Sequence, residues 1–404
     1  MRLETKKAID YHAGRPLLAI LQLAAWVLGS VLHRNHDVEP VRSILITKFQ
    51  GIGSLIIAKP ALAELRRQRP DVRIVFWGSI SMKVLADQMP EFDEVLLFDD
   101  RNLISACRSL AGTLPRIWRM RLDWAIDFEV YSRLSSALIT LSCARNRTGF
   151  ALEHIRSRRV HTHLVYFNRY RHLAEAYARI VGLLLPSGDT VDVTNYGIWR
   201  FELSPLPSIT DRYFVFNVHA GDLSLERRWP KASFKALIQD LLRLRPDAVA
   251  CLIGHGPAEV AYCADFCEDS RIRNLSGALS LKETIQLIAN AELVVTNDTA
   301  ALHLALSTGA PLVGLFGPTR AETFVPSSGA RVATAQIPLY CSPCVHHWEP
   351  APCHGDNQCM KRLTVSHVRS LCCEVLGIPA PSGSIEEPDA SDFYPGLVYK
   401  RPQG

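Results

Sequence analysis

The stretch that most constrains the fold runs from Val294 to Thr319 and reads VVTNDTAALHLALSTGAPLVGLFGPT. A β-rich run ends at a turn, a helix of small residues begins directly after Thr299, and a second apolar strand (Pro311–Phe316) follows. Such a strand–turn–helix junction points free backbone N–H groups and the positive helix end at whatever lies above the sheet. Asp298 and Thr299 are expected to cap the helix. Small side chains such as that of Ala300 would also let a diphosphate approach the backbone.

The length and composition indicate two ordinary globular domains. A chain of 404 residues exceeds one typical domain, and 48% hydrophobic with 21% charged residues is a globular composition. The net charge is only +5, and dense Lys/Arg runs interleaved with aromatic residues are missing, so a nucleic acid is not an expected partner. Eleven cysteines, an odd number, favour a reducing compartment with free thiols.

Strand and helix patterns alternate twice along the chain, which predicts an α/β protein with two doubly wound parallel sheets. The predicted strands are Ser43–Lys48, Arg73–Trp77, Glu94–Phe98, Trp124–Phe128, Tyr213–His219, Val249–Ile253, Leu293–Val295 and Pro311–Phe316. We expect Rossmann-like domains over residues 41–195 and 208–378, with a linker or variable edge between Pro186 and Pro207. Ligands of such sheets bind beyond the carboxyl ends of the strands. Residues 379–404 contain several prolines and are predicted to be disordered.

Residues 1–40 form a separate N-terminal segment. Pro16–Leu32 is apolar except for Gln22 and Ser30, and cationic side chains flank it on both sides. We expect a helix that lies in the membrane interface with its lysines and arginines at anionic headgroups. A single membrane span and a soluble packing helix remain alternatives, because seventeen residues are at the lower limit for crossing a bilayer. No clean cleavage site for a signal peptide follows.

Three segments in this order resemble those of a known family. They read KFQGIGSLIIAKPALAELRRQRP, HAGDLSLERRWPKASF and NDTAALHLALSTGAPLVGLFGPT. Together they resemble the heptosyltransferases of glycosyltransferase family 9, from about Ser43 to Leu376. The most specific part is Asp298–Thr319, where the family has Asp-Ser/Thr-Gly-x-x-His and Phe-Gly-Pro-Thr. The resemblance implies a GT-B fold, with two Rossmann-like domains facing across a cleft. It also implies inverting, metal-independent transfer of a heptose from an ADP-sugar to the lipopolysaccharide core.

The predicted donor site follows from the chemistry of the leaving group. Negative charge builds on the diphosphate as its bond to the sugar breaks, and fixed donors stabilise that charge. By resemblance, Arg227 takes the position of the basic residue that reaches the donor phosphate, as a planar guanidinium can do bidentately. The other donor-binding candidates are His219, Ala220, Gly221, Arg228, Asp298, Thr299, Ala300, His303 and Gly317. Alternatively, the two arginines flank a structural Trp-Pro helix start, and His303 is a structural histidine.

The acceptor loop departs from the family pattern. Family members typically carry an aspartate as general base directly after the second glycine, where this chain has Ser54. A serine hydroxyl has no useful basicity at neutral pH, so Ser54 is expected to cap the following helix and bind an oxyanion. Asp127 and Glu129 share one face of the extended segment at the end of a predicted strand. We therefore hypothesise that Glu129 is the base, whereas Asp127 is expected to be a buried structural acid.

Cationic residues in the first half predict an anionic acceptor, although a charge run is often only a solvated face. The acceptor-binding candidates are Gly51, Gly53, Lys59, Arg133 and His172. The other cations of this field are Arg145, Arg147, Arg156, Arg158, Arg159, Arg169 and Arg171.

Cys341, Cys344, Cys353 and Cys359 form a cluster with a spacing that leaves two interpretations open. A CxxC pair followed by two further cysteines is compatible with structural zinc. The later spacing is not the usual second CxxC, so reduced thiols or a local disulfide are the preferred interpretation, and no metal is assigned.

These features together predict a glycosyltransferase of heptosyltransferase type at a membrane surface, on the cytoplasmic side of the bacterial inner membrane. Its expected partners are a nucleotide-sugar and a glycolipid acceptor. Two alternatives remain: a nucleotide-sugar epimerase of the same architecture, and a non-catalytic sugar-nucleotide or glycolipid-binding protein, which Ser54 would suit.

Overall fold

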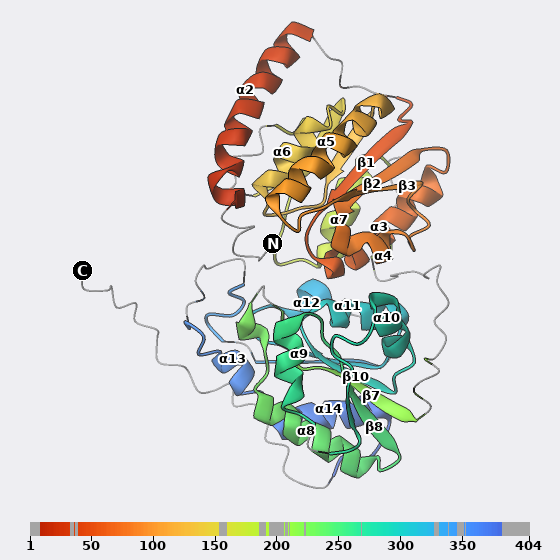
Figure 1. Cartoon of the computed structure of the whole chain (residues 1–404), viewed down its shortest axis with the longest axis vertical. Coiled ribbons are helices and arrows are strands. Elements are labelled where there is room, and N and C mark those ends of the chain that lie inside the picture. The colour runs from red at the N-terminus through yellow and green to blue at the C-terminus, as the bar shows by residue number, and fades with distance from the viewer. Residues whose placement is uncertain are drawn as a thin grey trace, which may run out of the picture. The chain divides into compact units, whose positions relative to one another are not determined.

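The chain forms two compact units, Met1–Phe201 and Glu202–Gly404, each built on one six-stranded sheet (Figure 1). The computed structural model describes residues 9–32, 36, 39–152, 160–185, 191–193, 206, 209, 211–221, 224–267, 269–326, 331–337, 339–345, 351 and 353–381. Most of the predicted linker and residues 382–404 of the predicted disordered tail lie outside these residues. Two α/β units confirm the predicted fold class.

The sheet of the first unit has the strand order β3-β2-β1-β4-β5-β6, and every neighbouring pair is parallel. Its strands are β1 (Ser43–Lys48), β2 (Arg73–Ser79), β3 (Glu94–Phe98), β4 (Trp124–Asp127), β5 (Asn146–Ala151) and β6 (His163–Tyr166). Its helices are α2 (Gly14–Leu32), α3 (Ile52–Gln68), the 3-10 turn η1 (Ile80–Met82), α4 (Lys83–Ala86), α5 (Leu103–Met120), α6 (Arg133–Leu141) and α7 (Leu173–Gly182). This is the Rossmann order, in which the chain reverses direction across the sheet between β1 and β4.

The first core lies between the sheet and helices α5 and α6. Apolar side chains at helical spacing, such as Ile117 of α5 and Leu138 of α6, pack on strand residues that include Leu45, Val75 and Trp77. On the other face of the sheet, α3 packs beside α7. Burial on both faces explains why these strands read as continuous apolar runs in the sequence.

The sheet of the second unit has the order β12-β11-β10-β7-β8-β9, again wholly parallel. Its strands are β7 (Arg212–Asn217), β8 (Ala248–Leu252), β9 (Ile272–Asn274), β10 (Leu293–Asn297), β11 (Leu312–Phe316) and β12 (Val332–Gln336). Its helices are η3 (Leu225–Arg227), α8 (Lys231–Leu244), α9 (Pro257–Ala264), α10 (Leu281–Ala289), α11 (Ala300–Thr308), α12 (Ala321–Phe324), α13 (Gln358–Lys361) and α14 (Val365–Leu376). Read from β9, this is the same order as in the first unit, with the reversal between β7 and β10.

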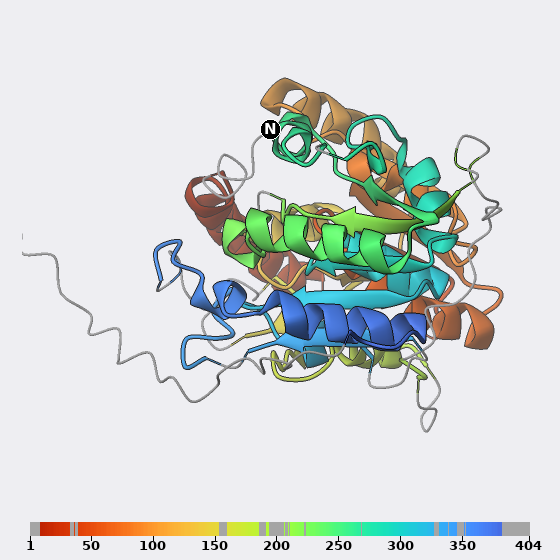
Figure 2. The same cartoon turned by 90° about the horizontal axis from the view of Figure 1, so that it is seen from below.

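Helices α8 and α14 pack side by side over one face of the second sheet (Figure 2). Phe234 and Leu241 of α8 and Val368 and Cys372 of α14 form a buried cluster with the inward side chains of the strands. Trp229, just before α8, is wholly buried in this cluster, and its indole N–H donates to the carbonyl of Leu363. The Trp-Pro helix start is therefore structural, as one interpretation of the sequence predicted.

Four strands at the outer part of the sheets were not predicted. They are β5, β6, β9 and β12. The strand β9 has only three residues, and β6 is only partly buried, so neither carries the continuous apolar pattern on which the prediction relied.

The N-terminal helix α2 belongs to the first unit and packs on α6. Within the described residues, no helix combines the length and apolarity required to cross a bilayer.

Candidate functional site

The carboxyl ends of β7 and β10 meet at the reversal point of the second sheet, and Arg227 joins the loops that follow them. One terminal nitrogen, Nη1, donates to the carbonyl of Asp298 at 2.6 Å, and Nη2 donates to the carbonyl of Ala220 at 3.1 Å. The residue is only 8% exposed, and its Nε is buried without a hydrogen-bond partner among the described residues. A buried guanidinium at this point supplies fixed positive charge where ligands of Rossmann-type sheets bind.

The loop after β10 is held by its own side chains. Asp298 accepts a hydrogen bond from the Thr319 hydroxyl at 2.8 Å, and its carboxylate lies 3.6 Å from Nη1 of Arg227. Thr299 caps α11 by accepting from the backbone N–H of Ala301 at 3.2 Å. The cap was predicted for both residues, but only Thr299 makes it, because the Asp298 carboxylate turns toward Thr319. The first turn of α11 thus starts at the arginine-bearing edge of the sheet.

His219 and its neighbours form the loop after β7. Its Nδ1 lies 2.9 Å from the backbone nitrogen of Gly221 and 3.2 Å from Oε1 of Glu259. Burial disfavours the ionised form of Glu259, but hydrogen bonds from His219 and from the backbone N–H of His255 outweigh it and lower the pKa of that carboxyl. Glu259, which the sequence analysis did not single out, therefore stays ionised and fixes the His219 loop.

Three donor candidates have clear packing contacts. The guanidinium of Arg228 lies over the Tyr262 ring, 5.0 Å from its centroid. His303 is 6% exposed and meets the Phe324 ring edge to face. A Cβ at Gly317 would lie 2.5 Å from the Met360 sulfur, so this glycine is required for packing.

In the first unit, the corresponding reversal point lies between β1 and β4, and Glu129 joins the segments that follow these two strands. Its Oε2 lies 2.8 Å from Nζ of Lys48, and its Oε1 accepts from the backbone N–H groups of Phe49 and Gln50 at 2.8 and 2.6 Å. Both charged side chains are buried. Burial is the largest single effect and lowers the pKa of Lys48, but the attractions of Glu129, Tyr177 and Asp127 together outweigh it, so the pKa is raised. A carboxylate held by three donors can serve as a positioning group for the loop after β1, and the hypothesis that Glu129 is the base stays a prediction.

The glycine-rich loop leads into α3. Gly51 has a φ of 79°, in the left-handed region that favours glycine, and precedes the first helical residue. The N-cap position has no side-chain hydrogen bond, so the predicted capping role of Ser54 is wrong. Ser54 lies in the first turn of α3, and its side chain forms a hydrogen bond with Tyr177. Burial raises the pKa of that tyrosine, despite the opposing effects of Lys48 and Ser54.

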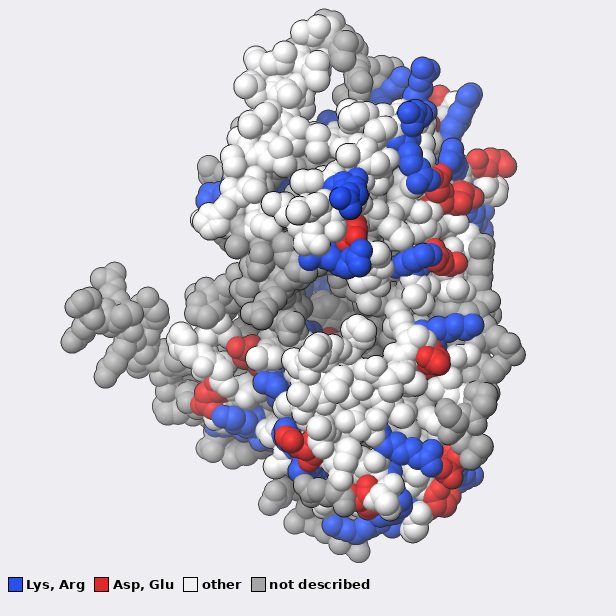
Figure 3. Space-filling view, in the orientation of Figure 1, with Lys and Arg blue, Asp and Glu red and all other residues white. Residues whose placement is uncertain are grey.

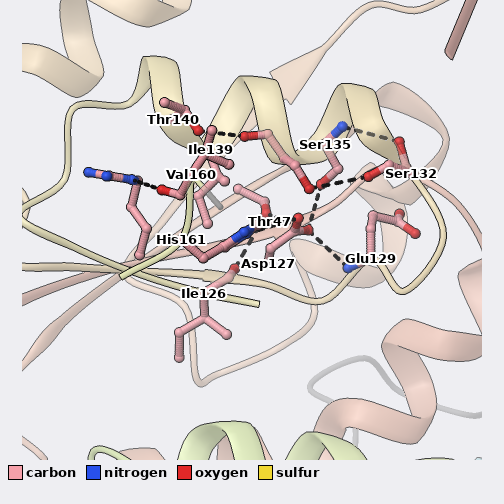
Figure 4. Close-up of polar contacts among 12 residues, drawn as sticks. Thr47, Ile126, Asp127, Glu129, Ser132, Ser135, Ile139, Thr140, Val160 and His161 are labelled. Carbon is pink, nitrogen blue, oxygen red and sulfur yellow. Dashed lines mark hydrogen bonds and ion pairs between the residues drawn. The ribbon is translucent and has the colours of Figure 1, made fainter. Parts of the chain in front are cut away.

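Asp127 is the buried structural acid that was expected. Figure 4 shows side chains converging on it from β1, α6 and the segment before β6. It accepts from the Ser135 hydroxyl at 2.5 Å and from the backbone N–H of Glu129 at 3.0 Å. His161 lies 3.8 Å away, with both side chains fully buried. A Cβ at Gly149 would lie 2.6 Å from the His161 ring, so a glycine is needed there.

Three acceptor-binding candidates have structural partners. Lys59 is 2% exposed and pairs with Glu91 at 2.8 Å, so its charge is balanced inside the first unit. Arg133 lies 3.6 Å from the carboxylate of Asp10 in the N-terminal segment. His172 caps α7 through its Nδ1. Among the other predicted cations, Arg156, Arg158 and Arg159 lie outside the described residues.

The cysteine cluster packs behind the loop after β11. The backbone N–H of Cys344 donates to the carbonyl of Pro318 at 2.9 Å. Burial raises the pKa of Cys344 to about 11 and that of Cys359 to about 12. All eleven cysteines are among the described residues and are free thiols. Within that part of the chain, no group of three or more His, Cys, Asp or Glu residues is arranged to hold a metal ion.

Residues that the sequence analysis missed mainly form hydrogen bonds or ion pairs that hold neighbouring loops together. Lys48 ends β1 and was not singled out, although a lysine in a buried strand requires a counter-ion. Asn297 accepts from the backbone N–H of Trp229 at 3.0 Å and donates to the carbonyl of His219 at 3.1 Å. Both Asn297 and Thr319 stand within the stretch Val294–Thr319 that opened the sequence analysis, which could have drawn attention to them.

Comparison with known proteins agrees with this architecture. The lipooligosaccharide heptosyltransferase 2 of Campylobacter jejuni subsp. jejuni serotype O:2 is 21% identical over 318 residues, which cover 77% of this chain and 91% of that protein. The lipopolysaccharide heptosyltransferase 1 of Salmonella typhimurium is 27% identical over 300 residues, covering 68% of this chain and 88% of that protein. The structure of E. coli ADP-heptose lps heptosyltransferase II superposes with a TM-score of 0.61 at 18% identity, covering 83% of this chain and 98% of that one.

The fold match supports the GT-B type of two Rossmann-like domains. The sequence pattern of glycosyltransferase family 9 (heptosyltransferase) matches residues 119–354, which span parts of both units. The chain is therefore a glycosyltransferase and belongs to glycosyltransferase family 9, the heptosyltransferase family.

Proposed function

We propose that this glycosyltransferase transfers a heptose, with inversion, from ADP-heptose to an acceptor of the lipopolysaccharide core. The structural relative from E. coli is named as an enzyme that uses ADP-heptose, and the relatives from Campylobacter and Salmonella are named as lipooligosaccharide and lipopolysaccharide heptosyltransferases. The observation that carries the proposal is the buried Arg227, held between the loops after β7 and β10.

Arg227 and the start of α11 would stabilise the diphosphate as it leaves. The carbonyls of Ala220 and Asp298 orient the guanidinium but leave its net charge in place. The nearby Asp298 carboxylate is shared with Thr319, so it offsets the arginine only in part. Because these groups are fixed before the donor binds, they need no reorganisation when charge develops in the transition state. The helix dipole adds to the same field.

The first unit would bind the acceptor at the loop that Lys48 and Glu129 hold. Glu129 fixes the backbone of Phe49 and Gln50 directly before the glycine turn at Gly51. We assign Glu129 a positioning role and Ser54 a hydrogen-bonding role in this loop. The acceptor is an anionic glycolipid at a membrane surface, on the side that supplies nucleotide-sugars. Eleven free thiols suit the reducing conditions of the cytoplasm.

The test measures ADP release and product formation with ADP-heptose and heptose-deficient lipopolysaccharide, beside UDP- and GDP-sugars as competing donors. Arg227→Met is expected to lower kcat by a factor of about 10² to 10³, the typical loss for one electrostatic donor. Arg227→Lys keeps the charge without the two-carbonyl geometry and should lose less. Arg243→Met changes an exposed arginine on α8 and serves as the control.

Circular dichroism and thermal unfolding must first show that both Arg227 variants fold. Folded Arg227→Met with unchanged kcat would refute the donor assignment. Product formation from a UDP-sugar but not from ADP-heptose would refute the donor identity.

A further inference from the structure

The N-terminal helix α2 is docked on the first unit along one face. Leu17, Leu18 and Leu21 recur at helical spacing and pack against Ala137 of α6 and Val160. Leu18 is only 1% exposed. The helix is therefore a fixed part of the domain along this face.

A second contact fixes the start of the segment. Oδ1 of Asp10 accepts from the Ser132 hydroxyl and from the backbone N–H of Leu134, both at 2.8 Å. Its Oδ2 lies 3.6 Å from Arg133. Asp10 thus serves as an additional cap for α6, where a carboxylate is favoured by the helix dipole. The orientation of α2 relative to the sheet is set by this clamp together with the leucine contacts.

The opposite face of α2 is apolar and exposed. Its exposed side chains are Ile20 (66%), Leu23 (63%), Trp26 (70%), Val27 (43%), Leu28 (55%) and Val31 (69%). Toward its C-terminal end, consecutive residues from 26 to 29 are all exposed, so the helix extends past α6 with apolar side chains around it (Figure 1). A contiguous apolar surface of this kind marks an interaction site.

The charge pattern identifies the occupant. No acidic residue occurs from Tyr11 to Leu32, and most of the described surface of α2 is free of charged side chains (Figure 3). Arg15 is exposed at the start of the helix, and the sequence places Arg2, Lys6 and Lys7 before it and Arg34 after it. An apolar helix face bordered by cations, with an exposed tryptophan, matches the interface of an anionic bilayer.

We propose that α2 is a rigidly docked membrane-binding surface, whose exposed apolar face enters the headgroup region of an anionic bilayer. Because the opposite face is fixed by Asp10 and the leucines, the helix also sets the orientation of the first unit on the membrane. This inference deepens the proposed function, since it places the enzyme at the surface that carries a glycolipid acceptor.

Sedimentation of the full-length protein with vesicles tests the surface. The vesicles are phosphatidylethanolamine with about one third phosphatidylglycerol, compared with pure phosphatidylcholine. Wild-type protein is expected to sediment with the anionic vesicles, and Leu23→Glu and Trp26→Glu should each weaken that partitioning about tenfold. Leu103→Glu is the matched control, because Leu103 of α5 is 64% exposed and should retain binding. Vesicle binding by Leu23→Glu at the wild-type level would overturn the proposal.

The alternative occupant is a second copy of the chain. If wild type is a dimer that Leu23→Glu converts to a monomer, and neither protein binds vesicles, the surface is a protein interface and the proposal is wrong.

Turnover separates this inference from the proposed function. On a detergent-free, delipidated acceptor, Leu23→Glu should match wild type, whereas on acceptor embedded in vesicles it should be slower. If the wild-type protein turns over neither acceptor, the proposed function is rejected. The result of the vesicle sedimentation would still hold. Asp10→Asn should bind vesicles as wild type does. Its turnover should be slower only on the acceptor that is embedded in vesicles. Equal rates for Asp10→Asn and wild type there would reject the fixed orientation.

Discussion

The buried pair of Lys48 and Glu129 allows a quantitative test of its role. The two side chains are 5% and 7% exposed and lie 2.8 Å apart. Glu129→Gln keeps the shape and one carbonyl oxygen for the backbone N–H groups, but leaves the Lys48 ammonium without its counter-ion. Removing one partner of a buried pair costs about 3 to 5 kcal/mol of folding free energy. With a urea m-value of about 2 kcal/mol/M, the unfolding midpoint of the first unit should fall by roughly 1.5 to 2.5 M.

The pH dependence of the stability lost in Glu129→Gln gives a second readout. In wild type the pKa of Lys48 is raised above its ordinary value of 10.5, so its contribution is complete below that pH and is lost only as pH rises through the folded pKa. In Glu129→Gln, the carboxylate that opposed the effect of burial on Lys48 is gone, so we expect the pKa of Lys48 in the folded state to fall below 10.5. The unfolded state then binds more protons, so the stability of the variant rises with pH up to about 10.5. The difference in the free energy of unfolding between wild type and Glu129→Gln should therefore become smaller from neutral pH toward pH 10.

Urea unfolding followed by tryptophan fluorescence measures both effects, with kcat determined on the same samples. The double variant Lys48→Met with Glu129→Gln should recover part of the stability. Glu91→Gln is a matched control, because it breaks another buried pair of 2.8 Å at the opposite, amino-terminal edge of the sheet. It should lose similar stability but retain kcat when folded. An unchanged urea midpoint for Glu129→Gln, together with lost turnover, would refute the positioning role and favour Glu129 as the base.

Two further predictions concern packing and thiol reactivity. Gly149→Ala places a methyl group 2.6 Å from the ring of His161, and overpacking should destabilise the protein by about 1 to 3 kcal/mol in thermal unfolding. Gly112→Ala, in α5 with open space around it, should be neutral or stabilising, and an equal loss for both variants would contradict the steric argument. Iodoacetamide at pH 8 should label the exposed Cys107 well before Cys359, whose burial raises its pKa to about 12, as mass spectrometry can show. Equal labelling rates for the two cysteines would contradict the burial of Cys359.

The sequence by itself determined the class of fold and the location of the turn after β10. Buried parallel strands require apolar runs on both faces, so β1, β2 and β10 were visible as such in the sequence. The turn after β10 was visible because a cap and small residues must follow a strand there. The short β9 and the partly buried β6 were not visible, because their stability comes from neighbours in the sheet rather than from their own pattern.

Only the tertiary structure decided what the charged side chains do. From the sequence, Glu129 was proposed as a base because it stands at the end of a predicted strand, and Lys59 as an acceptor ligand because it follows the glycine-rich loop. The fold instead buries each beside an opposite charge contributed by a segment more than thirty residues away, Lys48 for the first and Glu91 for the second. A buried charge must be paired, and its partner is set by which strand ends and helices meet in space. Local sequence patterns do not contain that information.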